Sequence, residues 1–212
     1  MCRRLCAAIG AVVVSVNYRL APEHRWPAAY DDGVDALRFI DTTGVPGLGA
    51  EVPVDLASCF LAGESAGGNI VHHVANRWAA RWPASAKRVR VAGIFPVQPY
   101  FGGVERTAAE SDPPDGVSLT VETADQFWRT ALPAGATRDH PVANPFGPDS
   151  PDLEAVALPP VLVEAPEGDV LRDRVLLYAA RLKEMGKAVE LAEFKGSSTA
   201  SPSCGGARPT RS

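Results

Sequence analysis

Long apolar runs, clusters of basic residues and cysteine patterns are all lacking from this sequence of 212 residues. No apolar stretch approaches the roughly 20 residues of a membrane-spanning helix. The net charge is −4 and the basic residues are scattered, so we expect no nucleic-acid partner and no binding to an anionic membrane. The four cysteines have neither metal-ligand spacing nor a disulfide framework. These absences favour a cytoplasmic chain that binds a small molecule and holds no metal and no cofactor.

Histidine is scarce as well, and it is unevenly distributed. The four histidines are His24, His72, His73 and His140, so all of them lie in the first two thirds of the chain. The last third therefore contributes no imidazole to any site.

The hydrophobic content of 46% is enough for one core, so we expect a single domain. Its first residues allow two interpretations. Arg3 and Arg4, followed by the apolar run 5–16, resemble a secretory signal peptide. Residues 11–16 lead into Asn17 without a small-residue cleavage site, however, which favours a buried core strand.

The segment GESAG at 63–67 is the most informative motif in the chain. Small residues such as Gly63 and Gly67, two before and two after a serine, let a strand and a helix pass closely at a sharp turn. Ser65 would then lie at a helix N-terminus, where the backbone N–H of Ala66 can receive an oxyanion. The alternative is an ordinary turn between a strand and a helix.

Apolar periodicity divides the chain into alternating strands and helices. We expect strands at 11–16, 59–62, 91–95, 161–163 and 189–194, and helices at 3–9, 28–41, 68–82, 123–132 and 172–184. Such alternation favours a parallel α/β sheet with right-handed crossovers. Residues 100–158 are rich in proline and glycine, and we expect them to form a cap-like region over a site.

Three stretches together resemble the plant carboxylesterase class of the α/β-hydrolase fold-3, or hormone-sensitive-lipase-like, family. They are SVNYRLAPEH (15–24) with PAAYDDG (27–33), GESAGGN (63–69) and GDVLRD (168–173). The resemblance covers residues 3–196. It implies a partial α/β-hydrolase fold, with a mostly parallel sheet, flanking helices and a cap-like insertion. It also implies a serine carboxylesterase that hydrolyses a small-molecule ester through an acyl-enzyme.

The family's catalytic triad runs serine, acid, histidine in chain order. The resemblance makes Ser65 the nucleophile and Asp169 the acid. The alternative for Asp169 is an N-cap on the helix that begins near Leu171, and Asp173 is expected to be a first-turn charge favourable to the helix dipole. No histidine follows Asp169, so the third member of the triad is absent and the resemblance predicts weak or absent activity.

The resemblance also implies that the domain is truncated at both ends. Family members carry a histidine-containing segment where this chain has SSTAS at 197–201. A one-base shift turns codons for Gln-Gln-His-Gly-Phe into codons for those five residues, so we hypothesise a shifted reading frame, real or an artefact of gene prediction. The genomic sequence would decide this. We expect an incomplete domain at 1–196 and a disordered tail at 197–212.

Upstream, family members have an H-G-G-G motif whose backbone N–H groups supply most of the oxyanion hole, and this chain begins after that point. The strand that bears the motif would lie between the strands at 11–16 and 59–62. We therefore expect a gap in the sheet, with unpaired backbone groups unless those two strands pair directly.

Two other interpretations stay open. Gibberellin receptors resemble the same family and lack the catalytic histidine, so a non-catalytic small-molecule binding protein is the alternative function. Those receptors close an N-terminal lid over the hormone, and this chain starts too late to include one. The remaining interpretation is a fragment that folds poorly. Substrate specificity and oligomeric state have no signal in the sequence.

Overall fold

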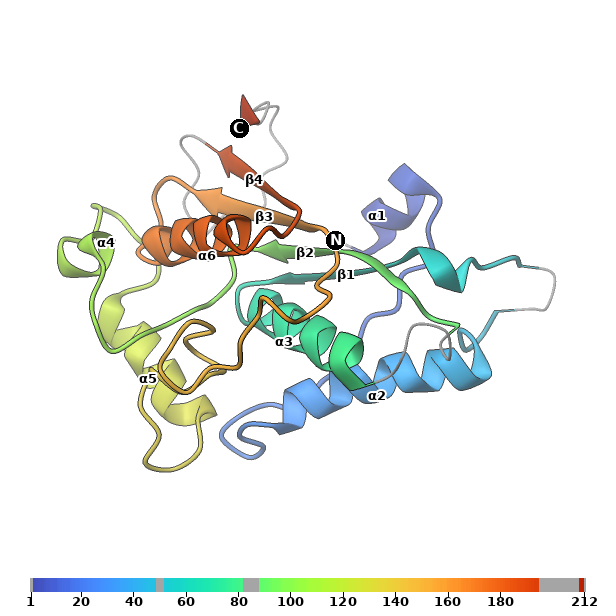
Figure 1. The fold of residues 1–212 in the computed structure, drawn as a ribbon, viewed down its shortest axis with the longest axis horizontal. Coiled ribbons are helices and arrows are strands. Elements are labelled where there is room, and N and C mark those ends of the chain that lie inside the picture. The colour runs from blue at the N-terminus through green and yellow to red at the C-terminus, as the bar shows by residue number, and fades with distance from the viewer. Residues whose placement is uncertain (1, 49–51, 82–87, 195–209, 212) are drawn as a thin grey trace.

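Four parallel strands and the helices between them form the body of the computed structural model (Figure 1). The structure describes residues 2–48, 52–81, 88–194 and 210–211. The strands are β1 (Cys59–Glu64), β2 (Val91–Val97), β3 (Val161–Pro166), β4 (Val189–Phe194) and β5 (Thr210–Arg211). The helices are α1 (Cys2–Ile9), α2 (Ala28–Thr43), α3 (Ala66–Arg81), α4 (Ala108–Ser111), α5 (Val121–Ala131) and α6 (Arg172–Glu184), with a 3-10 turn η1 (Leu56–Ser58). Within these ranges, no helix is both long and apolar enough to cross a membrane.

The strand order in the sheet follows the chain from β1 to β5. Neighbouring strands from β1 to β4 are parallel, so the chain must cross over between them. Helix α3 makes the crossover from β1 to β2, and α6 makes the one from β3 to β4. The predicted parallel α/β architecture is confirmed. Because the strands are parallel, the segments that follow β1, β2 and β3 meet at one edge of the sheet.

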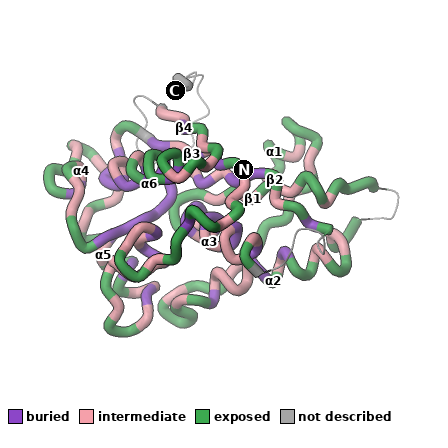
Figure 2. The backbone as a smooth tube through the Cα atoms, viewed as in Figure 1, coloured by how far each residue is buried: buried purple, intermediate pink, exposed green. Residues whose placement is uncertain are grey.

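The main core lies between the sheet and helices α3 and α6. Buried Ile94 and Val163 from the strands pack with Val71 of α3 and with Tyr178 and Leu182 of α6. The two helices therefore cover the same face of the sheet. Figure 2 shows buried residues where these helices meet the strands, whereas α1 has no buried residue.

Helix α2 packs on α3 rather than on the sheet. Val34 and Leu37 of α2 form a buried cluster with Val74 and Trp78 of α3. A Cβ atom at Gly33 would lie 2.6 Å from a methyl carbon of Val74. The glycine of the PAAYDDG stretch thus lets the two helices approach closely.

Residues 100–158 contain α4 and α5 and no strand. Trp128 of α5 and Val142 pack in one buried cluster with Val170, which follows β3, and with Tyr30 of α2. The segment therefore lies over the carboxyl edge of the sheet. Its function as a cap stays a prediction.

The predicted strand at 11–16 is wrong. These residues form no regular element, and no described segment pairs with them. Their side chains alternate at first, with Val13 partly buried and Val12 and Val14 more than 40% exposed. An apolar alternating sequence decides which side chains face inward, but a strand also needs a hydrogen-bonding neighbour.

The outer edge of β1 is unpaired within the described residues as well. The N–H of Ser65 donates to Val97, so by strand alternation the backbone groups of Phe60, Ala62 and Glu64 point away from β2. The side chain of Phe60 is 55% exposed. Residues 11–16 do not pair with β1. The described residues thus leave the gap beside β1 that the sequence analysis expects.

The prediction of a disordered tail is wrong at two residues. Thr210 and Arg211 form β5 and pair antiparallel with Glu193 and Ala192 of β4. The unpaired edge of β4 offers backbone donors and acceptors to any extended segment, whatever its side chains. Residues 195–209 and Ser212, which hold the rest of the predicted tail and the hypothesised frame shift, lie outside the described residues.

A pair of histidines joins α3 to its neighbours. His72 is fully buried; its Nε2 lies 3.0 Å from the Asn76 amide nitrogen, and its Nδ1 lies 2.9 Å from the Tyr178 hydroxyl. His73 Nε2 lies 3.1 Å from the carbonyl oxygen of Val142. Burial lowers the pKa of His72 well below its ordinary value and lowers that of His73 to about 4.

These two histidines make the fold sensitive to acid. The folded chain holds them neutral, so between pH 6.5 and about 4 the unfolded chain binds more protons. We expect the free energy of unfolding to fall as pH drops through this window, by about 1.4 kcal/mol per pH unit for each histidine. Urea unfolding at several pH values would measure the slope. His73→Gln should reduce this slope, whereas Ser15→Ala, which changes no titratable group, should not, and equal slopes in the two variants would contradict the expectation.

Candidate active site

The serine of the GESAG motif lies at a bend that few residues adopt. Ser65 stands between the end of β1 and the start of α3 with φ at +53°, in the left-handed region that disfavours side chains. Its backbone N–H donates to Val97 at 2.9 Å, and its carbonyl accepts from the N–H of Tyr100 at 3.0 Å. The end of β2 therefore holds the bend in place.

The glycines around Ser65 have unequal roles. A Cβ atom at Gly63 would lie 2.3 Å from the carbonyl oxygen of Gly67, which is closer than any real contact. A Cβ atom at Gly67 would meet nothing within 4 Å, whereas one at Gly68 would lie 3.0 Å from Pro99. The expectation of a required small residue holds for Gly63 and is wrong for Gly67, because the tight contact uses only the backbone of Gly67.

Ser65 and Ala66 open into a cavity of about 290 Å³. Aromatic side chains form much of its wall, namely those of Tyr18, Trp26, Tyr30, Tyr100, Phe127 and Trp128. They come from the loop before α2, from α2 itself, from the end of β2 and from α5. The cavity, called the serine cavity below, is thus enclosed between the sheet edge and residues 100–158.

The backbone N–H of Ala66 is free to bind a ligand. Ala66 is the first residue of α3, where N–H groups have no partner within the helix and the helix dipole is positive. No described residue accepts a bond from this N–H. The hydroxyl of Ser65 likewise has no bonding partner among the described residues, and the side chain is exposed.

Asp169 lies in the segment between β3 and α6 and is only 4% exposed. Its Oδ1 accepts the N–H of Leu171 at 2.7 Å. The N-cap position of α6 belongs to Leu171, so the alternative of Asp169 as the N-cap is wrong, although Asp169 does order the approach to the helix. Asp173 lies in the first turn of α6 and also accepts the N–H of Ala109 at 2.8 Å.

Ser65 and Asp169 follow β1 and β3 at the same edge of the sheet. With β2 between them, the two strands are about 10 Å apart at the usual strand spacing. Asp169 is not part of the wall of the serine cavity. The structure therefore brings Ser65 and Ala66 together, and it places Asp169 nearby without direct contact with the cavity.

The histidines do not complete a triad. His24 lines the serine cavity, whereas His72 and His73 make the packing contacts described above. His140 Nδ1 accepts the N–H of Val142 at 3.2 Å. No described imidazole bonds to Ser65.

Asn69 is a site residue that the motif analysis missed. Its side chain is 1% exposed and accepts from the Tyr30 hydroxyl at 2.8 Å. It also donates to the carbonyl oxygens of Tyr100 at 3.0 Å and Val142 at 2.7 Å. This amide joins α3, α2 and residues 100–158 under the serine cavity. The available signal was the helical spacing of Asn69 with His72, His73 and Asn76, which places four polar side chains on one face of a helix that packs in the core.

Burial raises the pKa of the Tyr30 hydroxyl well above its ordinary value. Tyr30 therefore stays protonated and continues to donate to Asn69. Among the described residues, no group of three or more His, Cys, Asp or Glu side chains could hold a metal ion.

Comparison with known proteins agrees with this arrangement. The model of a family described as having the alpha/beta hydrolase fold matches residues 1–200. A gibberellin receptor of Arabidopsis thaliana is 44% identical over 191 residues, covering 90% of this chain and 53% of the receptor. The 3-O-acetylpapaveroxine carboxylesterase of Papaver somniferum is 37% identical over 198 residues, covering 89% of this chain and 61% of that enzyme.

Solved structures give the same result. An esterase of Pyrobaculum calidifontis superimposes with a TM-score of 0.79 at 33% identity, covering 94% of this chain and 61% of the esterase. The chain belongs to the α/β-hydrolase family, as its motifs predict. It spans between half and two thirds of the length of these relatives.

The two glycines of the motif should respond differently to alanine. Gly63→Ala forces a Cβ atom onto the backbone of Gly67, and we expect a loss of about 3 kcal/mol in the free energy of unfolding. Gly67→Ala meets no atom and removes a glycine from a helix, so its effect should be neutral or a gain of about 0.5 kcal/mol. Urea titration of the two variants would measure both free energies of unfolding. Equal losses of stability in the two variants would contradict the close contact between Gly63 and Gly67.

Proposed function

We propose that this chain is a serine carboxylester hydrolase by descent and that its own activity is weak or absent. The observation that carries the proposal is the hydroxyl of Ser65, held at a left-handed bend beside the free N–H of Ala66 in an aromatic-lined cavity. Carboxylesterases and esterases among the relatives support the same chemistry. The cytoplasmic location expected from the cysteines is part of the proposal.

In this mechanism Ser65 Oγ attacks the carbonyl carbon of an ester, and the alcohol leaves to give an acyl-enzyme that water then hydrolyses. The N–H of Ala66 donates to the oxyanion that forms at each step. Asp169 would orient the imidazole that takes the serine proton. The sequence has no histidine after His140, so this proton has no acceptor of that kind.

The expected loss is large. Removing the histidine of a serine triad costs on the order of 10⁶ in turnover. The residual acceleration of roughly 10³ to 10⁴ in such variants comes from substrate binding and from the oxyanion hole. The described residues offer one oxyanion donor, Ala66, and each donor is worth about 10² to 10³. The acceleration left to this chain should thus be small.

The serine cavity favours esters with apolar or aromatic groups. Arg19, the cationic residue at its rim, is engaged by the carboxylate of Asp32 at 2.7 Å. Tyr30 and Asn69 are engaged with each other. Most of the remaining wall consists of aromatic and aliphatic side chains rather than charged ones, which suits a substrate without a carboxylate.

A short-chain p-nitrophenyl ester tests this proposal. We expect hydrolysis near the background rate, with Ser65→Ala indistinguishable from the unaltered chain. Added imidazole should then raise the rate of the unaltered chain more than that of Ser65→Ala, because it supplies the missing proton acceptor. The variant of exposed Ser15, Ser15→Ala, is the control and should behave as the unaltered chain. Robust hydrolysis that needs Ser65 would contradict the impairment, and imidazole rescue that is equal in all variants would contradict the nucleophile.

The second candidate function is small-molecule binding without catalysis. Four gibberellin receptors are 40 to 44% identical to this chain, whereas the carboxylesterases are 35 to 37% identical. Calorimetry with a gibberellin would test this function. Saturable heat that persists in Ser65→Ala would support binding, and the absence of heat would reject it.

A further inference from the structure

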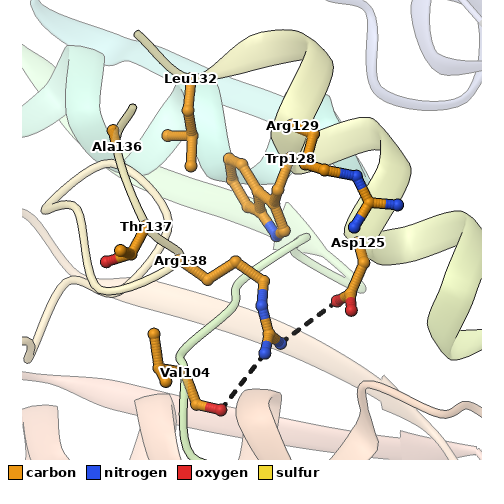
Figure 3. Close-up of a pocket in the computed structure, with 8 residues that line it drawn as sticks. All are labelled: Val104, Asp125, Trp128, Arg129, Leu132, Ala136, Thr137 and Arg138. Atoms are coloured by element: carbon orange, nitrogen blue, oxygen red, sulfur yellow. Dashed lines mark hydrogen bonds and ion pairs between the residues drawn. The ribbon is translucent and has the colours of Figure 1, made fainter. Parts of the chain in front are cut away.

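A second cavity of about 200 Å³ lies between α5 and the segment that follows it (Figure 3). Trp128 and Leu132 form its apolar wall, and the segment from Ala136 to Arg138 faces them. Trp128 lines both cavities. The second cavity contains none of the residues assigned to ester hydrolysis, and it is called the arginine cavity below.

Positive charge exceeds negative charge in this wall. Arg129 and Arg138 are its cations, and Asp125 is its carboxylate. Arg138 reaches Asp125 at 3.2 Å and the carbonyl oxygen of Val104 at 3.2 Å, as Figure 3 shows. Outside the wall, Arg106 also binds Asp125, through two hydrogen bonds. Asp125 is thus already neutralised, and the lining keeps one cation in excess.

The pKa of Asp125 reflects this excess. Burial alone would raise it, but the hydrogen bonds from Arg106 and the charges of Arg138 and Arg129 lower it below its ordinary value. The carboxylate therefore remains charged and occupied by its arginines.

Two hydrogen-bond donors in the wall have no acceptor. The side chain of Trp128 lines the cavity, and no described residue accepts a hydrogen bond from its indole N–H. Figure 3 shows that indole nitrogen turned toward Arg138. The hydroxyl of Thr137 accepts the N–H of Asp139 at 3.3 Å and has its own proton to donate. Both residues line the cavity, so these two groups can donate hydrogen bonds to a ligand that accepts them.

We propose that the arginine cavity binds a small monocarboxylate, with its oxygens facing the Trp128 indole N–H, the Thr137 hydroxyl and the arginines. The apolar part of the ligand packs on Leu132 and Ala136. This inference does not depend on the ester chemistry proposed for Ser65.

The size and charge of the cavity select the ligand. Its volume equals that of about seven waters at roughly 30 Å³ each, which suits a benzoate or a short fatty acid. A single excess positive charge matches a monoanion better than a phosphate, and Leu132 and Ala136 would leave a phosphate without partners on one side.

The test uses the indole N–H signals in the nitrogen–proton spectrum of the labelled chain. The sequence has four tryptophans, and Trp128→Phe identifies the signal of Trp128. Titration with sodium benzoate should move that signal saturably. Benzamide, which has the same shape without the charge, should not move it saturably, and phosphate should bind far more weakly than benzoate.

Substitutions in the wall give the second readout. Arg129→Gln should weaken benzoate binding about tenfold, and Thr137→Val about threefold. Arg38→Gln, an exposed arginine on α2 that pairs with Asp35 at 3.0 Å, is the matched control and should leave binding unchanged. The dispersed spectrum of each variant verifies that it is folded.

Three results would overturn the proposal. They are a Trp128 signal that does not move at millimolar benzoate, equal binding of benzamide, and equal loss of affinity in Arg129→Gln and Arg38→Gln. If phosphate bound as tightly as benzoate, the proposed selectivity for a monocarboxylate would be rejected and the cavity would be a general anion site.

Discussion

The contact between the backbones of Gly63 and Gly67 is the constraint on which the site depends. It brings the end of β1 within van der Waals distance of the first turn of α3, and the chain can turn that sharply only if the residue between adopts a left-handed conformation. Ser65 takes that conformation, and hydrogen bonds to Val97 and Tyr100 retain it. The exposed hydroxyl and the free N–H of Ala66 are both consequences of this one close approach.

The parts of the fold that depend on local periodicity could be predicted from the sequence. Helix α6 was expected at 172–184 and is observed at those residues, and β4 likewise matches 189–194. Their apolar residues recur at the period of a helix in α6 and of a strand in β4, so these elements can be recognised without knowing what they pack against. The strand expected at 11–16 failed for the opposite reason, because its apolar alternation requires a neighbour that the described residues do not supply. β5 was missed because pairing with an open edge depends on backbone groups rather than on composition.

Of the candidate site, only the residues of the GESAG motif could be predicted from the sequence. Ser65 and Ala66 follow from glycine spacing, whereas Asn69 acts through acceptors and donors far away in the chain, such as Val142. The serine cavity combines residues from the loop before α2, from the end of β2 and from α5, and no local pattern indicates that these segments meet. Trp128 illustrates the same limit, since its spacing along the helix does not reveal that it lines two cavities.

The open edge of β1 has a consequence for handling the protein. The backbone groups of Phe60, Ala62 and Glu64 point outward and have no strand partner in the part of the chain that the structure describes, and the one charged side chain of the three is at the end of the row. Such an edge, with no proline and little repulsion, is a template on which extended segments of other molecules assemble. Within the described residues, this edge is therefore the place where we expect intermolecular β-pairing at high protein concentration.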